Sequence, residues 1–234
     1  MLLFLAPLLI LFEAGSLLYL TDAETGVVET ISAYSILGRA SEAFGIAGFA
    51  VPGILLIVGL LIWHTLLRDP WRADPATLAG MLIESIAWTL PLLAIAALIG
   101  PTSAVQLDSD PGGQLAAAQP GDWPWQARLT LAVGAGLYEE MLFRLLLIPL
   151  VIVVFRDLIR LRASSSRFAA IGLSALLFAA YHDLSGPGGI DAARLLFFLV
   201  AGVYFGALFV WRGFGIVVGV HAAYDIVVLL VLTK

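Results

Sequence analysis

The chain has 234 residues, of which 61% are hydrophobic and 12% are charged, and its formal net charge at pH 7 is −5. With a mean hydropathy of +1.02, it carries more apolar surface than a water-soluble fold of this size buries, which indicates a polytopic membrane protein. It has no basic stripe to neutralise phosphates, which excludes nucleic acid as a partner. It also has no cysteine, which excludes disulfides, thiolate nucleophiles and cysteine-based metal sites.

Continuous apolar stretches predict about seven transmembrane helices (six to eight), because a hydrocarbon core about 30 Å thick takes roughly 20 helical residues. In chain order they cover residues 1–20, 43–67, 80–100, 129–155, 168–183, 194–211 and 214–233. The stretches do not alternate with period two, so the predicted fold is an all-α polytopic transmembrane helix bundle. We interpret residues 1–234 as a single transmembrane domain.

The arginines in the predicted loops indicate an orientation. Those assigned to one side are Arg68, Arg72, Arg156, Arg160, Arg162, Arg167 and Arg212. The other side holds most of the loop acids and only four basic residues: Arg39, Arg128, Arg194 and Lys234. The positive-inside rule then predicts a cytoplasmic N-terminus and an external C-terminus. The membrane we expect is the plasma (inner) membrane.

Two glycine pairs mark close helix contacts near the C-terminus. Gly202 and Gly206 lie in the sixth predicted span, and Gly215 and Gly219 lie in the seventh. Each pair forms a small-xxx-small step, which lets helix backbones approach closely. We expect these glycines to bring the sixth helix or its neighbours against the seventh.

The fourth predicted span contains a charged cluster in an otherwise apolar stretch: Glu139, Glu140 and Arg144. One charge at the bilayer centre costs about 2.5–3.5 kcal/mol, so such a cluster indicates a functional site. Glu140 and Arg144 are four residues apart in the order that favours an ion pair. That pairing leaves Glu139 about 100° further round the helix.

Polar residues also lie in the fifth and seventh spans. Phe178 and His182 are four residues apart, as are His221 and Asp225, so each pair shares a helix face. A rise of about 1.5 Å per residue places these groups and Glu139 in the same half of the bilayer. Singly, each could be a packed or interfacial polar group. Together, they predict a shared polar site.

Four motifs in this order resemble those of the CPBP intramembrane protease family, which contains CAAX-processing and bacteriocin-processing (Abi) enzymes. They are Glu139-Glu140-x-x-x-Arg144, Phe178-x-x-x-His182, Phe198-x-x-x-Gly202 and His221-x-x-x-Asp225. The resemblance covers about residues 131–230, a family-like catalytic core preceded by three less diagnostic spans.

The resemblance implies an intramembrane endopeptidase that hydrolyses a membrane-associated protein or peptide. By position, Glu139 and His182 would activate the attacking water, and His221 and Asp225 would face the oxyanion. Glu140, paired with Arg144, would support the site, together with Phe178. The implied partners are a membrane-tethered substrate and the lipid bilayer, and the oligomeric state stays open.

The chain departs from the common family pattern at two positions. Leu145 stands where a glycine usually follows the arginine, and Asp225 stands where asparagine is often found. An ionised aspartate would repel an oxyanion, so we interpret Asp225 as a group that orients His221 and favours its charged form.

We expect no required cofactor. Zinc is the alternative, because two histidines and a glutamate form the ligand set of several catalytic zinc sites. If a metal were present, its ligands would be Glu139, His182 and His221.

Other functions stay open at this stage. Chains of Glu, His and Asp also serve proton-coupled transporters, and a non-catalytic membrane scaffold or self-immunity protein could keep the same fold. A serine protease could use Ser174 with His221. Glu13 lies near the middle of the first span and could support the site, whereas Glu84 and His64 are expected to reach the headgroups.

Overall fold

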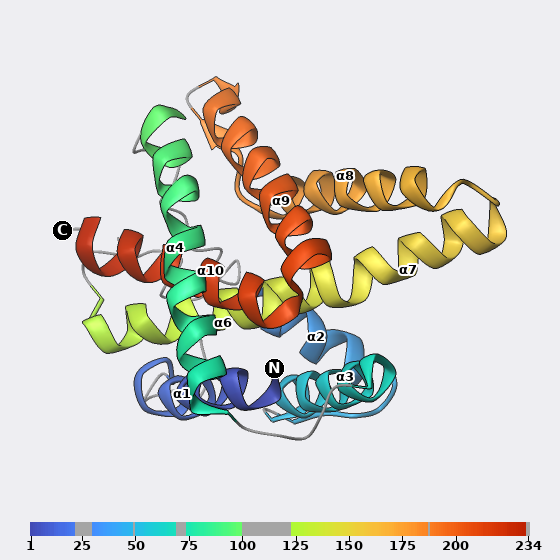
Figure 1. The fold of residues 1–234 in the computed structure, drawn as a ribbon. Coiled ribbons are helices and arrows are strands. Elements are labelled where there is room, and N and C mark those ends of the chain that lie inside the picture. The colour runs from blue at the N-terminus through green and yellow to red at the C-terminus, as the bar shows by residue number, and fades with distance from the viewer. Residues whose placement is uncertain (22–29, 49, 69–73, 100–122, 187, 233–234) are drawn as a thin grey trace.

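The structure is a computed structural model that describes residues 1–21, 30–48, 50–68, 74–99, 123–186 and 188–232 (Figure 1). The elements in chain order are α1 (Leu2–Tyr19), α2 (Ser32–Glu42), α3 (Val51–Leu67), α4 (Pro75–Ile99), α6 (Trp125–Glu140), η3 (Met141–Leu146), α7 (Leu147–Val153), η4 (Val154–Leu158), α8 (Ala163–Tyr181), β1 (Ser185–Gly186), β2 (Gly189–Ile190), α9 (Ala192–Arg212), α10 (Phe214–Ile226) and η5 (Val227–Leu232). The all-α polytopic bundle predicted from the sequence is confirmed.

Among the described residues, five helices are long and apolar enough to cross a membrane: α1, α4, α8, α9 and the continuous α10–η5. The helix α3 is apolar but shorter. The predicted span 129–155 forms a longer helical rod, in which α6, η3, α7 and η4 follow one another without a break. Figure 1 shows this rod extending beside α8, while α4 and α9 cross it.

The sequence did not predict α2, and α3 begins later than the predicted span 43–67. Gly45 and Gly48 have φ angles of 77° and 148°, a backbone region that only glycine enters readily. Pro52 then occupies the first turn of α3, where its missing N–H leaves no hydrogen bond unmade. The chain therefore breaks between the two helices.

Two other helices begin earlier than predicted because aspartates cap them. Asp74 accepts hydrogen bonds from the backbone N–H groups of Ala76 and Thr77 at the start of α4. Asp191 accepts from the N–H groups of Ala193 and Arg194 at the start of α9. Such caps satisfy N–H groups that have no partner within the helix.

The two glycine pairs pack against different neighbouring helices. A methyl group added to Gly202 of α9 would lie 2.7 Å from the Cα of Ala175 in α8, and Gly206 similarly faces Ile171 of α8. Gly215 and Gly219 of α10 approach α4 instead. The pair on α9 therefore packs against α8, and the pair on α10 packs against α4, a neighbour of α9, and against the start of α1.

Two polar residues that the sequence places near the ends of predicted spans, Glu84 and His64, make contacts within the protein. Glu84 forms a two-point ion pair with Arg212, with a 2.7 Å contact between Oε2 and Nη2, which ties α4 to the end of α9. His64 is buried, so the expectation that it reaches the headgroups is wrong.

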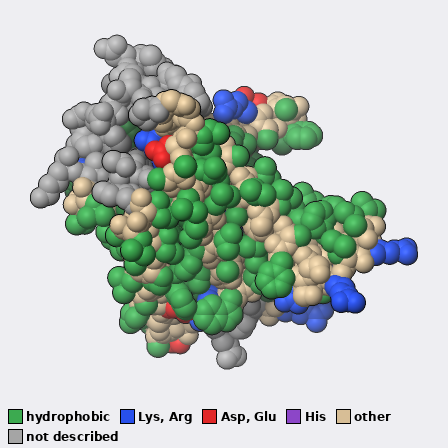
Figure 2. Space-filling view, turned by 90° about the horizontal axis from the view of Figure 1, so that it is seen from above, with side chains coloured by type: hydrophobic (Ala, Val, Ile, Leu, Met, Phe, Trp, Pro, Cys, Tyr) green, Lys and Arg blue, Asp and Glu red, His purple; other side chains and the backbone are tan. Residues whose placement is uncertain are grey.

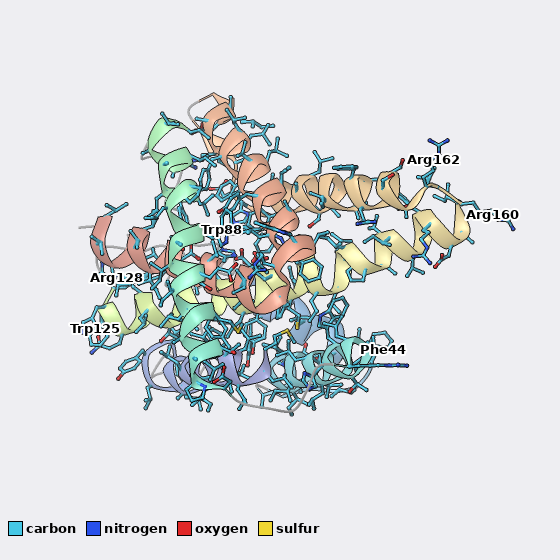
Figure 3. All side chains as sticks on the ribbon, viewed as in Figure 1. Phe44, Trp88, Trp125, Arg128, Arg160 and Arg162 are labelled. Carbon is cyan, nitrogen blue, oxygen red and sulfur yellow. The ribbon has the colours of Figure 1, made fainter. Side chains whose placement is uncertain are left out.

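The ends and the outer surface of the molecule suit a membrane. Figure 3 shows Arg160 and Arg162 at one end of the molecule and Arg128 at the opposite end. The predicted orientation assigns these arginines to opposite sides of the membrane. Figure 2 shows hydrophobic side chains over much of the face in view, which lipid can cover. Arg72 and the predicted span ends at residues 100 and 233 lie outside the described residues. The orientation stays a prediction.

Candidate active site

Three segments bring the predicted polar residues together. Glu139 and Glu140 are the last residues of α6, and His182 directly follows α8. His221 and Asp225 lie on α10. The helices α6 and α10 can pack closely because Gly136 has no side chain. A methyl group at this position would lie only 2.9 Å from the backbone nitrogen of Ala222.

Glu139 lies between the two histidines. Its Oε2 atom is 3.8 Å from Nε2 of His182 and 3.8 Å from Nε2 of His221. The residue is 4% exposed. These distances exceed a direct hydrogen bond, so a small molecule placed among the three groups could contact all of them.

The ring of His182 is held in one orientation. Its Nδ1 atom lies 2.8 Å from the backbone oxygen of Phe178, and a carbonyl oxygen can only accept, so Nδ1 must carry the proton. In the neutral ring, Nε2 then has a free lone pair on the side of Glu139. Phe198 stacks on the imidazole at 3.8 Å between ring centres, which fixes the plane of the ring.

His221 faces a carboxyl group with each ring nitrogen. Nδ1 is 2.7 Å from Oε1 of Glu140, and Nε2 is 3.4 Å from Oδ2 of Asp225. Both neighbours favour protonation, because the positively charged ring can donate from both nitrogens. Phe205 stacks on the ring at 4.6 Å. His221 can therefore place a positive charge at the site.

Arg144 is fully buried behind the two histidines. Its Nη1 atom is 3.1 Å from Oε1 of Glu140, although none of its guanidinium nitrogens makes an aligned hydrogen bond among the described residues. The guanidinium instead lies over the rings of Phe178 and Phe205, at 4.2 Å and 5.2 Å from their centres. Ion pairing and cation–π attraction together hold this charge.

The helices that carry the acids change their winding beside the site. Glu140 is followed directly by the π-helix η3, and α10 continues into the π-helix η5 just after Asp225. Short π-helical turns inside α-helices occur frequently at functional sites.

A cavity of about 30 Å³ lies among these groups. One water molecule needs roughly 10–15 Å³ of such space, so the cavity accommodates water but not a peptide. Its polar lining is Glu139, His182, His221, Tyr224 and Asp225, and its apolar lining is Ile31, Leu92, Ala135, Phe178, Phe197, Phe198, Ala201 and Phe205.

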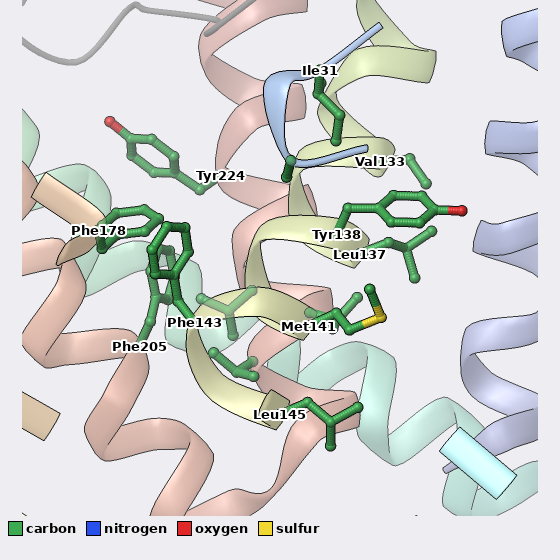
Figure 4. Packing of buried hydrophobic residues seen from close by; sticks show 14 of the residues in the cluster. Ile31, Val133, Leu137, Tyr138, Met141, Phe143, Leu145, Phe178, Phe205 and Tyr224 are labelled. Carbon is green, nitrogen blue, oxygen red and sulfur yellow. The ribbon is translucent and has the colours of Figure 1, made fainter. Parts of the chain in front are cut away.

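Sequence reasoning missed several of these lining residues. Ile31 and Leu92 belong to the first hundred residues, which carry no motif, so no sequence signal pointed to them. Tyr224 and Phe205 had weak signals: Tyr224 lies within the His221-x-x-x-Asp225 motif, and Phe205 follows the glycine of Phe198-x-x-x-Gly202. Figure 4 shows Phe143, Phe178 and Phe205 close together, whereas Tyr138 points to the other side of α6.

Two other candidates lie elsewhere. The hydroxyl of Ser174 donates a 2.8 Å hydrogen bond to the backbone oxygen of Phe143 and is fully buried, which is a packing contact between α8 and η3. Glu13 accepts a 2.7 Å hydrogen bond from the hydroxyl of Tyr138. Neither Ser174 nor Glu13 lines the cavity.

The donor set for a metal is present but spread out. Ligands about 2.1 Å from a tetrahedral zinc ion lie roughly 3.4 Å from one another. The 3.8 Å separations from Glu139 Oε2 to each histidine Nε2 are slightly longer. Within the described ranges, no group of three His, Asp or Glu side chains has the arrangement of a metal site.

The fold and the site define an integral membrane protein with a buried glutamate–histidine centre. Residues 121–227 match the family model described as type II CAAX prenyl endopeptidase Rce1-like. This match is consistent with the CPBP/CAAX protease family that the four motifs resemble, and the matched family is one of membrane proteases. No curated protein and no solved structure gave a significant match.

Proposed function

We propose that this protein is an intramembrane endopeptidase in which Glu139 and His182 activate a water molecule to hydrolyse a peptide bond. The observation that carries the proposal is the position of the Glu139 carboxyl group, 3.8 Å from Nε2 of both His182 and His221, beside a cavity of water size. The family match over residues 121–227 supports the reaction class, and the geometry supports the roles of the individual residues.

In the proposed reaction, Glu139 takes a proton from the water while the lone pair on Nε2 of His182 orients it. The resulting hydroxide attacks the carbonyl carbon of the scissile bond. Negative charge then develops on the carbonyl oxygen, and the protonated ring of His221 stabilises it. The proton held by Glu139 passes to the leaving amine, the carbon–nitrogen bond breaks, and a carboxylic acid and an amine are released.

The carboxyl groups near His221 act through its ring. Asp225 at Nε2 and Glu140 at Nδ1 favour the positive imidazolium and fix its orientation. Arg144 balances the charge of Glu140. In this way two of the three acids at the site, Glu140 and Asp225, have positively charged neighbours.

The substrate class is a membrane-associated protein or peptide. Because the cavity has room for water only, the surrounding helices must separate to admit a peptide backbone. Phe198 stacks on the ring of His182 and is one of the apolar side chains that line this cavity. The description of the matching family model is that of a CAAX prenyl endopeptidase, so a prenylated CAAX peptide is the first probe, and a peptide on a transmembrane anchor is the second.

The test is cleavage of these two quenched fluorescent peptides in proteoliposomes. Wild type is compared with Glu139→Gln, His182→Ala, His221→Ala and Ser174→Ala at equal amounts of folded protein. We expect loss of cleavage in the first three variants and near wild-type cleavage for Ser174→Ala. Full activity in all of the first three would defeat the enzyme proposal, and loss in Ser174→Ala alone would favour a serine mechanism. Proton transport without cleavage would favour a transporter.

A further inference from the structure

One residue of the cavity wall, Tyr224, carries a hydroxyl group that has no role in the reaction described so far. Tyr224 lies on α10 between His221 and Asp225, and it is 3% exposed. Its hydroxyl oxygen is buried, and among the residues that the structure describes it has no hydrogen-bond partner. A buried hydroxyl without a partner costs free energy, so its presence calls for an explanation.

Packing accounts for the ring but not for the hydroxyl. The Tyr224 ring stacks on Phe197, with the ring centres 5.9 Å apart and the planes inclined by 27°. Phenylalanine would make the same stack. Two other tyrosine hydroxyls in the bundle are bonded: Tyr138 donates to Glu13, and Tyr204 donates to the backbone oxygen of Trp88. The Tyr224 hydroxyl differs from these.

The position of Tyr224 points to a ligand. The residue lines the same cavity as Glu139, His182, His221 and Asp225. Figure 4 shows its ring extending from α10 on the side where Phe178 lies. A substrate backbone that entered this apolar cavity would lose its hydrogen bonds to water, and each unmatched carbonyl or N–H group would weaken binding.

The chemistry of the lining selects the substrate group. Glu139 and Asp225 are acceptors when ionised, so they can satisfy substrate N–H groups. Carbonyl oxygens need donors, which the proposed reaction takes from His221 alone, and that ring serves the scissile carbonyl. An uncharged phenol hydroxyl is a donor that suits a second carbonyl.

We propose that the Tyr224 hydroxyl donates a hydrogen bond to a backbone carbonyl oxygen of the bound substrate, next to the scissile bond. This inference rests on the proposed function. Tyr224 is then a substrate-binding residue that holds the peptide in register with Glu139. Among the described residues the hydroxyl has no partner, because in this proposal its partner is the substrate.

The variant Tyr224→Phe removes only the hydroxyl. We expect kcat/KM for a peptide that wild type cleaves to fall about 10- to 100-fold, as for loss of one hydrogen bond to a buried group. We also expect the thermal midpoint in detergent to stay equal or to rise, because a buried group without a partner is removed. A purely structural hydroxyl would give the reverse pattern.

Tyr204→Phe is the matched control, since it removes a hydroxyl that is bonded within the bundle. It should lower the midpoint and leave kcat/KM within about twofold, well below the loss expected for a substrate contact. Full activity of Tyr224→Phe, or an activity loss matched by a lower midpoint, overturns the inference.

Glu139→Gln in the same assay separates the two proposals. If Glu139→Gln keeps full activity, the proposed function fails. If Glu139→Gln is inactive while Tyr224→Phe is fully active, only the inference about Tyr224 fails.

Discussion

The hydroxyl of Tyr138 donates a 2.7 Å hydrogen bond to the carboxyl group of Glu13, which joins α1 to the helix that carries Glu139. Tyr138 directly precedes Glu139, and its ring contacts the rings of Phe12 and Tyr34, each with ring centres 5.0 Å away. The first two helices thus hold one face of α6, while α10 holds the face with the acids. The part of the chain without family motifs supports the site through this contact.

We expect Tyr138→Phe to destabilise the protein by about 1–3 kcal/mol, because it leaves the Glu13 carboxyl group without its donor. The measurement is thermal or chemical unfolding in detergent. Tyr19→Phe is the control, since Tyr19 is 46% exposed and should change nothing. In a double-mutant cycle with Glu13→Ala, a coupling energy near zero would show that the two residues act independently.

Glu139 and Glu140 should respond differently to the same substitution. Glu140 contacts both Arg144 and His221, so Glu140→Gln leaves a buried positive charge unbalanced and should cost about 3–5 kcal/mol of stability. Glu139→Gln should abolish cleavage with little change in the unfolding midpoint. Equal loss of stability in both variants would contradict the separate roles assigned to them.

Asp225→Asn should retain substantial activity, within about tenfold of wild type, because the amide oxygen can still accept from Nε2 of His221. The present contact is 3.4 Å, which makes Asp225 a supporting group for the ring. Steady-state kinetics in proteoliposomes measure the effect. Complete loss of activity would show that the negative charge itself takes part in the reaction.

The purified enzyme should keep its activity after treatment with strong chelators, because Glu139, His182 and His221 are assigned to water and the oxyanion without a metal. Activity is measured before and after chelation, and bound metal is measured by elemental analysis. The expectation is wrong if chelation removes activity and zinc restores it.

Gly202→Ala should lower the unfolding midpoint strongly, because the added methyl group would lie 2.7 Å from the backbone of Ala175. The backbone cannot yield there without separating α8 from α9. Gly172→Ala is the matched control on α8, where nothing lies within 4 Å of the added carbon. Alanine favours a helix over glycine by up to about 1 kcal/mol, so this variant should be unchanged or more stable.

Local sequence patterns predicted much of the architecture. Long apolar stretches identified all seven regions that form the main helices. The i, i+4 spacing placed His221 and Asp225 correctly on one face of α10, whereas His182 lies just beyond the end of α8 and not on its helical face. The amphipathic helix α2 was missed because it is neither long nor continuously apolar. The glycine pairs were recognised as contact points, but their partners were not, because a small-xxx-small step specifies a close approach without specifying the neighbouring helix.

The sequence by itself determined that this protein belongs in a membrane and that its costly polar residues must meet, since buried charges in lipid need partners. Only the tertiary structure decided which atoms meet: Nδ1 of His221 with Glu140, Nε2 of both histidines with Glu139, and Tyr224 in the cavity wall. Composition and spacing constrain each helix separately. The contacts between helices depend on tilt, rotation and the shape of the touching surfaces, which arise only when the whole bundle packs.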